Sequence, residues 1–156
     1  MTKEAFEEAV LALHDTLYYV SYSLLTSRTD QEDAVQECLH KALRKRESLR
    51  DDQYLKTWLI RILINECHNV LRKKKREIPS EEVIAYVPPD AEADLHDAVS
   101  SLEEKLRLPV VLHYLQGYTT REVAQILRTP ESTIKSRLAR ARQLLGEMIA
   151  PKEVLI

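Results

Sequence analysis

Residues 129–142 read TPESTIKSRLARAR, a Thr-Pro pair followed by apolar residues at helical spacing with basic residues between them. Thr129 is suited to the N-cap of a helix. Pro130 is suited to the first helical position, where its missing N–H costs nothing. We therefore predict a helix that begins here and runs to about Ile149.

A shorter helix is expected immediately before this one. Thr119 and Glu122 have the spacing of a capping box, and the helical pattern continues to Leu127. Arg128 and Thr129 then form the turn. Helix, short turn and longer helix is the order of a helix-turn-helix, whose second helix enters the major groove of DNA.

The two faces of the last helix differ in character. One face, expected to pack on the preceding helix, carries Ile134, Leu138, Ala141, Leu145 and Met148. The other face carries Ser132, Ser136, Ala139, Arg140 and Gln143, with Thr133 and Lys135 beside it. Short side chains allow close approach to a groove, and a helix N-terminus favours phosphate. Arg137 and Arg142 lie on the flanks, suited to phosphates or to intramolecular pairs. A solvated charged face is the alternative, but the cap, the proline and the preceding capped helix together favour DNA reading.

The composition of the 156 residues narrows the fold and function. Only two glycines are present, so we expect neither an all-β fold nor a glycine-rich nucleotide loop. The two cysteines do not indicate a disulfide scaffold, and no Cys/His spacing is that of a structural zinc site. No catalytic pattern occurs. We expect no enzyme, no metal, no cofactor and no small-molecule substrate.

Charge and hydropathy bear on the location of the chain. The formal net charge is −2, so the whole chain is not a basic nucleic-acid coat. The N-terminus lacks a basic stretch followed by an apolar core, and no apolar run approaches the ~20 residues of a membrane span. We expect a cytoplasmic protein without membrane insertion.

The first half of the chain has three helical patterns. Residues 2–26 carry one apolar stripe. A second helix is expected to open with a capping box of Thr29 and Glu32, to run to about Glu47, and to include Leu39 and Leu43 in its apolar face. A polar turn spans residues 48–54. The third helix, about 55–76, is apolar on more than half its circumference and ends in a basic run.

The stretch at 78–94 separates this half from the helix-turn-helix. It holds three prolines and no lysine or arginine, which indicates a flexible linker. We predict an all-α protein with two small helical domains, residues 1–78 and 95–156, joined by a linker at 79–94. Within the second domain, Pro109 is expected to open or kink a helix that ends with Gly117 as its C′ residue.

The third helix also carries a polar strip. It consists of Thr57, Arg61, Asn65, His68 and Arg72, with Trp58 beside it. Amide, guanidinium and imidazole groups next to an indole suit single-stranded or melted DNA, whose bases stack on aromatic rings. An ordinary solvated surface explains the strip equally well on this pattern alone.

Three ordered segments resemble one family: QEDAVQECLHKALRKRESLR at 31–50, KTWLIRILINECHNVLRKKKR at 56–76, and LRLPVVLHYLQGYTTREVAQILRTPESTIKSRLARARQLL at 106–145. Together they resemble the extracytoplasmic-function (ECF) sigma factors of bacteria, promoter-recognition subunits of RNA polymerase. The most specific part is TIKSRLARAR, which is similar to the family pattern T-V-K-S-R-L-x-R-A-R.

The resemblance implies a role for each segment. The first domain would bind core RNA polymerase and would melt and read the promoter −10 element, and the second would read the −35 element as duplex. The polymerase-binding residues implied are Asp33, Gln36, Glu37 and Lys41. The −10 residues implied are Ser48, Asp51 and Tyr54 of a loop that captures a flipped-out base, with Thr57, Trp58, Arg61 and Asn65. The −35 residues implied are Ser132, Thr133, Lys135, Ser136, Arg137 and Arg140. An anti-sigma factor is also an implied partner.

The chain departs from the family pattern at three places, one of which is the loop 48–54, where the asparagine of some family members has no obvious match. Arg128 stands in the turn where the family often has glycine, so either Arg128 adopts a strained backbone or the turn differs. Glu66 falls on the apolar side of its helix without an evident partner. Two other functions are kept open: a dimeric helix-turn-helix regulator that acts without polymerase, and an adaptor that mimics a sigma factor without reading DNA.

Overall fold

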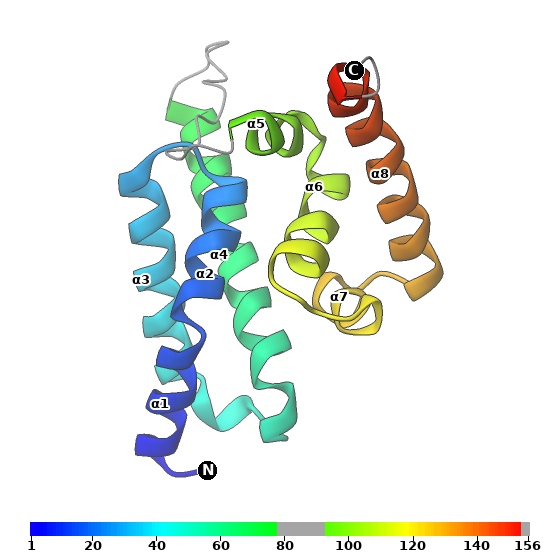
Figure 1. Ribbon diagram of the computed structural model, residues 1–156. Coiled ribbons are helices and arrows are strands. Elements are labelled where there is room, and N and C mark those ends of the chain that lie inside the picture. The colour runs from blue at the N-terminus through cyan, green and yellow to red at the C-terminus, as the bar shows by residue number, and fades with distance from the viewer. Residues whose placement is uncertain (78–92, 154–156) are drawn as a thin grey trace. The chain divides into compact units, whose positions relative to one another are not determined.

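In the computed structural model, which describes residues 1–77 and 93–153, every regular element is a helix (Figure 1). The all-α prediction is confirmed for these residues. The chain divides into two compact units, Met1–Val83 and Ile84–Ile156. This division falls within residues 79–94, which the sequence predicts as a flexible linker; residues 78–92 lie outside the described part.

Within its described residues, 1–77, the N-terminal unit contains four α-helices. They are α1 (Lys3–Ala12), α2 (His14–Leu24), α3 (Arg28–Arg44) and α4 (Leu55–Glu77). Short 3-10 turns at Arg46–Ser48 and Asp52–Tyr54 connect α3 to α4. Helix α3 packs along α4, and α2 packs against both. The largest fully buried side chains of the unit are Phe6, Leu17, Leu25, Leu59, Ile60 and Leu63.

The expected single helix at 2–26 is in fact two helices, so this prediction was wrong. They meet at Leu13, whose φ and ψ of −95° and 4° leave the helical region. Phe6 and Val10 before the break and Leu17 after it are all buried. Because the apolar stripe continues across the break, its spacing carries no sign of the interruption.

Helix α3 differs from its prediction at both ends. Ser27, not Thr29, caps it, since the Ser27 hydroxyl accepts a 3.3 Å hydrogen bond from the Asp30 amide. The helix ends at Arg44, three residues earlier than expected. Leu43 is 44% exposed, although the helical wheel places it on the apolar face. Gln31 is buried and donates to the Leu25 carbonyl at 2.7 Å, which fastens the start of α3 to the preceding turn.

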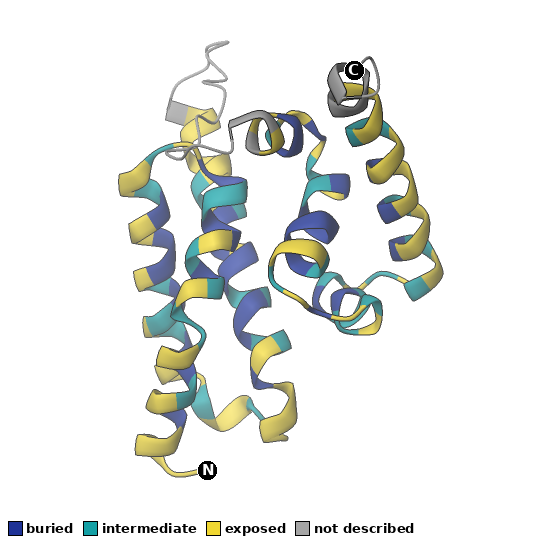
Figure 2. Ribbon diagram, in the orientation of Figure 1, coloured by how far each residue is buried: buried dark blue, intermediate teal, exposed yellow. Residues whose placement is uncertain are grey.

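The C-terminal unit contains α5 (Ala93–Ser101), α6 (Glu104–Val110), a π-helical turn (Val111–Leu115), α7 (Thr120–Leu127) and α8 (Glu131–Glu153). Helix α8 packs against α6, α7 and α5. Figure 2 shows buried residues on the side of α8 toward α6 and exposed residues on its other side.

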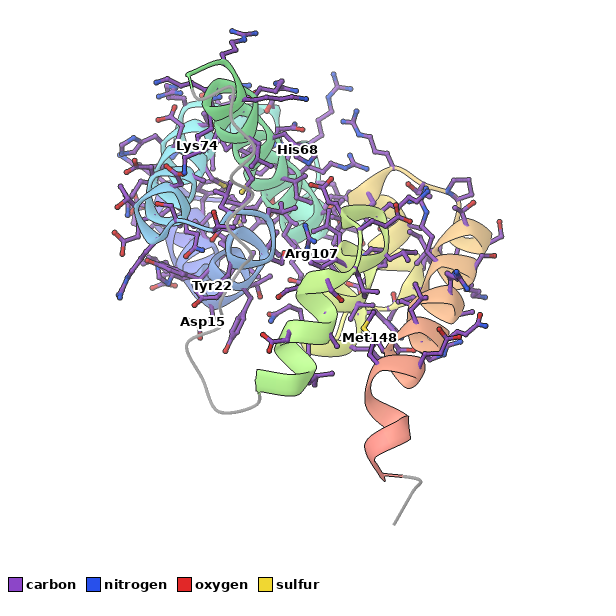
Figure 3. All side chains as sticks on the ribbon, turned by 90° about the horizontal axis from the view of Figure 1, so that it is seen from above. Asp15, Tyr22, His68, Lys74, Arg107 and Met148 are labelled. Carbon is purple, nitrogen blue, oxygen red and sulfur yellow. The ribbon has the colours of Figure 1, made fainter. Side chains whose placement is uncertain are left out.

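A proline lies inside α6, and a glycine ends the π-helical turn that follows it. Pro109 lies inside α6, so it does not open the helix. The π-helical turn follows directly, and Gly117 ends it with a φ of 79°. The Tyr118 amide then donates to the Leu112 carbonyl at 3.0 Å, so the role predicted for Gly117 as C′ residue is confirmed. Arg107 of α6, labelled in Figure 3, donates to the Leu102 carbonyl at 2.7 Å and so holds the end of α5.

Candidate nucleic-acid interface

The start of α7 is closed by the predicted capping box. The Thr119 hydroxyl accepts from the Glu122 amide at 3.1 Å, and the Glu122 carboxylate accepts from the Thr119 amide at 2.9 Å. Val123 and Ile126 on the inner face of α7 are buried. The cap and the buried face therefore fix where α7 begins and which side it presents to α8.

Arg128 forms the turn between α7 and α8 in a left-handed conformation, with φ 52° and ψ 46°. It is the one non-glycine residue with positive φ in the described part of the chain. This conformation costs about 1–2 kcal/mol in a residue with a Cβ atom. The first of the two alternatives left open by the sequence is therefore correct: Arg128 adopts a strained backbone where the family often has glycine.

Thr129 does not cap α8, so that prediction was wrong. Its hydroxyl donates to the Leu127 carbonyl at 3.0 Å, and its amide donates to the Ala124 carbonyl at 3.0 Å. Helix α8 begins at Glu131, and its first backbone hydrogen bond runs from the Ile134 amide to the Pro130 carbonyl at 3.1 Å. The left-handed Arg128 turns the Thr129 side chain toward the end of α7, which leaves Pro130 in the cap position.

Glu131 links the two helices and was missed by the sequence reasoning. Its carboxylate accepts a hydrogen bond from the Thr120 hydroxyl at 3.2 Å, between α8 and α7. The same oxygen lies 3.6 Å from the Lys135 ammonium. A carboxylate in the first turn of a helix also interacts favourably with the helix dipole. Glu131 therefore connects the two helices and also pairs with Lys135 at the surface.

The buried face of α8 is shorter than predicted. Ile134, Leu138 and Ala141 are buried as expected. Leu145 is only half-buried, and Met148 is 43% exposed, with its sulfur 3.4 Å from the Ser101 hydroxyl of α5 (Figure 3). The wheel assumed one continuous partner along α8, whereas α7 is only eight residues long and covers the first turns.

The opposite face of α8 presents the predicted −35 residues. Ser132, Lys135, Ser136 and Arg140 are exposed, while Thr133 and Arg137 are half-buried on the flanks. The Ser136 hydroxyl donates to the Ser132 carbonyl at 3.0 Å, and Arg140 donates to the Gln143 side chain at 3.3 Å. Arg142, which lies on the flank of the helix, instead donates to the Tyr114 hydroxyl at 2.6 Å and so makes an intramolecular contact.

The predicted −10 residues gather at the start of α4 and in the turn before it. The Asp51 carboxylate accepts from the Gln53 amide at 3.1 Å, and Tyr54 is 48% exposed. The Ser48 hydroxyl donates to the Lys45 carbonyl at 2.6 Å. These turn residues are thus held in place by short local hydrogen bonds.

The four residues on α4 differ in their exposure. Thr57, Trp58 and Arg61 are half-buried, and Asn65 is exposed. The Trp58 and Phe6 rings are in T-shaped contact, with their centroids 6.0 Å apart. One part of the indole therefore belongs to the contact between α4 and α1, and the rest is open to solvent.

The predicted polymerase-binding residues on α3 fall into two groups. Asp33 and Gln36 are exposed, and Glu37 pairs with Arg44 at 3.5 Å. The Lys41 ammonium, by contrast, pairs with the Glu66 carboxylate of α4, whose side chain is only 9% exposed. This pair answers the open question of how Glu66 is accommodated on the apolar side of its helix.

Near this pair the core contains the two cysteines, Cys38 and Cys67, both fully buried. Burial raises the pKa of the Cys38 thiol to about 12, with smaller contributions from Cys67 and Glu66 and an opposing one from Lys41. The Cys38 thiol donates to the Leu59 carbonyl at 3.6 Å. The thiol is therefore a protonated core group that packs α3 on α4.

The basic end of α4 is partly neutralised within the unit. Lys74, labelled in Figure 3, lies 2.6 Å from the Asp30 carboxylate of α3, and Arg72 donates to the Asn69 side chain. Across residues 1–77 and 93–153, no group of three or more His, Cys, Asp or Glu side chains is placed to hold a metal ion. No helix within those ranges is long and apolar enough to cross a membrane.

Comparisons with known proteins give the same two-part division. Residues 9–77 match the family described as Sigma-70 region 2, and residues 92–145 match Sigma-70, region 4. The ECF RNA polymerase sigma factor SigM of Mycobacterium tuberculosis is 35% identical over 155 residues, with 93% of this chain and 77% of that protein covered. The ECF RNA polymerase sigma-E factor of Haemophilus influenzae is 30% identical over 146 residues, with 80% and 77% covered.

Among solved structures, the sigma factor RpoE of Bartonella quintana, crystallised with the anti-sigma factor NepR, superposes with a TM-score of 0.80. It is 29% identical, and the match covers 94% of this chain and 98% of that one. The helix-turn-helix with its exposed polar row and the matches over both units lead to one conclusion: the chain belongs to the family of ECF RNA polymerase sigma factors.

Proposed function

We propose that this sigma factor reads the −10 element with its N-terminal unit and the −35 element with its C-terminal helix-turn-helix. As a sigma factor, it directs promoter-specific transcription initiation. The observation that carries the proposed division is the row of exposed polar side chains on α8, set over the buried Ile134, Leu138 and Ala141 on a capped, braced pair of helices.

At the −35 element, short and long side chains on α8 have separate roles. Ser132 and Ser136 leave room for the helix to enter the major groove, and Arg140 extends far enough to reach base edges. Thr133 and Arg137 on the flanks bind the phosphate backbone. Lys135 begins in its pair with Glu131 and exchanges that carboxylate for a phosphate or a base.

At the −10 element, the N-terminal unit handles single-stranded DNA. The turn with Ser48, Asp51 and Tyr54 receives an unstacked base, with the exposed tyrosine ring as a stacking surface. Trp58, Arg61 and Asn65 line the neighbouring surface of α4, with Thr57 beside them. Because one part of the indole already contacts Phe6, Trp58 stacks on DNA with its remaining open surface.

Core RNA polymerase binds the outer face of α3. Asp33, Gln36 and Glu37 supply that contact, and Lys41 contributes through its hold on Glu66. The protein itself performs no catalysis and takes no small-molecule substrate, because chemistry on the nucleotides belongs to the polymerase. Because RNA polymerase transcribes in the cytoplasm, we expect the protein to act there.

An anti-sigma factor is the expected inhibitor. The Bartonella quintana sigma factor that superposes on this chain was crystallised with the anti-sigma factor NepR. A comparable partner of this chain would block initiation by covering the polymerase-binding or DNA-binding surfaces.

Run-off transcription with purified core RNA polymerase on genomic fragments tests the proposal. Initiation at a defined set of promoters is expected with the chain and not with core enzyme alone. Stable dimers that bind a palindromic site and that support no initiation with core enzyme would instead favour the helix-turn-helix regulator. Polymerase binding without any promoter preference would favour the adaptor.

A further inference from the structure

The turn of the helix-turn-helix contains a side chain whose presence the fold does not explain. Arg128 adopts the left-handed conformation that favours glycine, with φ 52°. A glycine here would form the same turn without the steric conflict of a Cβ atom. Residues that persist in strained conformations are concentrated at functional sites, where the side chain repays the strain.

Among the described residues of the unit, no hydrogen bond or ion pair of the Arg128 side chain offsets this strain. The residue is exposed, and its backbone amide forms the turn bond to Gln125. Within residues 1–77 and 93–153, its guanidinium has no hydrogen bond or ion pair. Two basic side chains of α8 differ in this respect, since Lys135 is paired with Glu131 and Arg142 with Tyr114.

The location of Arg128 limits what it can bind. It lies three residues before Glu131, at the end of α8 whose first turns carry Ser132 and Ser136. In a docked helix-turn-helix, this end of the second helix points into the major groove, and the first helix crosses the phosphate backbone. The turn between them then lies over the groove edge, where phosphates are the available partners.

We propose that Arg128 is a DNA-backbone contact, its guanidinium binding a phosphate beside the bases that α8 reads; this inference rests on the proposed −35 function. The bracing bonds from Thr129 to Ala124 and from Thr120 to Glu131 hold the corner rigid, so the guanidinium is presented at a fixed edge. A phosphate contact positions α8 and is indifferent to base sequence.

Three substitutions at this position separate the effect of backbone strain from the effect of the side-chain charge. Arg128→Gln keeps the strain and removes the charge, Arg128→Lys keeps both, and Arg128→Gly removes both. Lys105→Gln, on the exposed side of α6, removes a charge from the same unit away from the turn and serves as control. Each variant is assembled with core RNA polymerase, and its affinity for a promoter fragment recovered by run-off transcription is measured at 50 and 200 mM salt.

Loss of one phosphate contact reduces the slope of log affinity against log salt concentration by about 0.9. The affinity of Arg128→Gln relative to the unchanged chain should therefore be lower at 50 mM salt, and this difference should shrink by about 3.5-fold at 200 mM salt. Arg128→Lys and Lys105→Gln should behave like the unchanged chain. Arg128→Gly should bind as weakly as Arg128→Gln, while the amides of α7 and α8 exchange hydrogen more slowly because the turn is relaxed. This opposition of affinity and stability is not expected if Arg128 has only a structural role.

Two results overturn the inference. One is an Arg128→Gln variant with unchanged affinity and salt slope when the unchanged chain initiates normally. The other is an Arg128→Gly variant that binds at least as tightly as the unchanged chain. If the unchanged chain directs no initiation with core polymerase, the proposed function itself is wrong. The Arg128 inference alone is wrong only when the unchanged chain initiates normally and one of these two results is found.

Discussion

The pair between Lys41 and Glu66 should make the N-terminal unit respond very differently to the loss of each partner. In Lys41→Met, the Glu66 carboxylate stays in the core with its side chain only 9% exposed and its charge uncompensated. In Glu66→Leu, the Lys41 ammonium is left over, but its side chain is 30% exposed and its flexible stem can carry the charge into water. The Glu66 carboxylate is therefore the partner that cannot reach water when its counterion is removed.

The magnitudes follow from this asymmetry. Removing one member of a buried pair costs about 3–5 kcal/mol, and because Lys41 is partly hydrated we expect about 2–3 kcal/mol for Lys41→Met. Glu66→Leu should change the free energy of unfolding by no more than about 1 kcal/mol, since an apolar group replaces the carboxylate. The double variant should be close to the unchanged chain, so its destabilisation should be about 2–3 kcal/mol below the sum of the single variants.

The chain contains a built-in probe for the measurement. Trp58 is its single tryptophan, and its ring packs on Phe6 between α4 and α1, so its fluorescence reports unfolding of the N-terminal unit. With a urea m-value of about 1 kcal/mol per M for so small a unit, the midpoint of Lys41→Met should fall by about 2–3 M. Equal losses from the two single variants would refute the reasoning, as would a double variant whose destabilisation equals their sum.

The double variant also tests the assignment of Lys41 to the polymerase-binding surface. If Lys41 acts only through Glu66, Lys41→Met/Glu66→Leu should bind core polymerase normally, whereas Gln36→Ala on the exposed side of α3 should weaken binding. A stable double variant that fails to bind polymerase would show that the ammonium itself contacts the enzyme.

Three further outcomes are expected. Arg140→Ala should weaken promoter use by about 1–3 kcal/mol in a manner that depends on the −35 base, whereas Lys135→Ala should do so more uniformly if Lys135 binds phosphate; competition among −35 sequence variants measures both. Thr119→Ala should destabilise α7 by about 1 kcal/mol, while Thr129→Ala should have little effect because its hydroxyl caps no amide, as hydrogen exchange of α7 and α8 will report. Cys38 is fully buried, and its pKa is raised to about 12. It should therefore be alkylated at pH 8 only when the N-terminal unit unfolds. Alkylation of the native unit within minutes would contradict the placement of Cys38 in the core.

The helices that the sequence predicts best are those with chemical signals at their ends. The capping box of Thr119 and Glu122 and the C′ glycine Gly117 were predicted correctly, because each depends on a few adjacent residues. The break at Leu13 was not predictable, since buried side chains continue on both sides of it. The cap of α3 was misplaced because Ser27 and Thr29 both precede helical residues, and only the backbone of the structure decides between them.

The sequence predicted which side chains of the candidate site share an exposed face, but not which residues pair across helices. Helical spacing placed Ser132, Ser136 and Arg140 on one exposed face, and the structure agrees. Spacing says nothing about contacts between elements, so the bond from Thr120 to Glu131 was missed. The same limit left Glu66 without a partner, since Lys41 lies 25 residues away on another helix.

Internal pairing gives a physical reason for weak promoter binding by the free chain. A net charge of −2 offers little attraction to DNA, and Lys74 and Lys135 are already paired with Asp30 and Glu131. Each phosphate contact made by such a lysine must break an ion pair as well as release counterions, so its net gain is small. Binding to core polymerase removes the need for high intrinsic affinity, because tethering raises the effective concentration of promoter at each unit. Tight, sequence-specific binding by the isolated chain in an electrophoretic mobility shift assay would contradict this explanation, whereas binding that strengthens sharply on addition of core polymerase would support it.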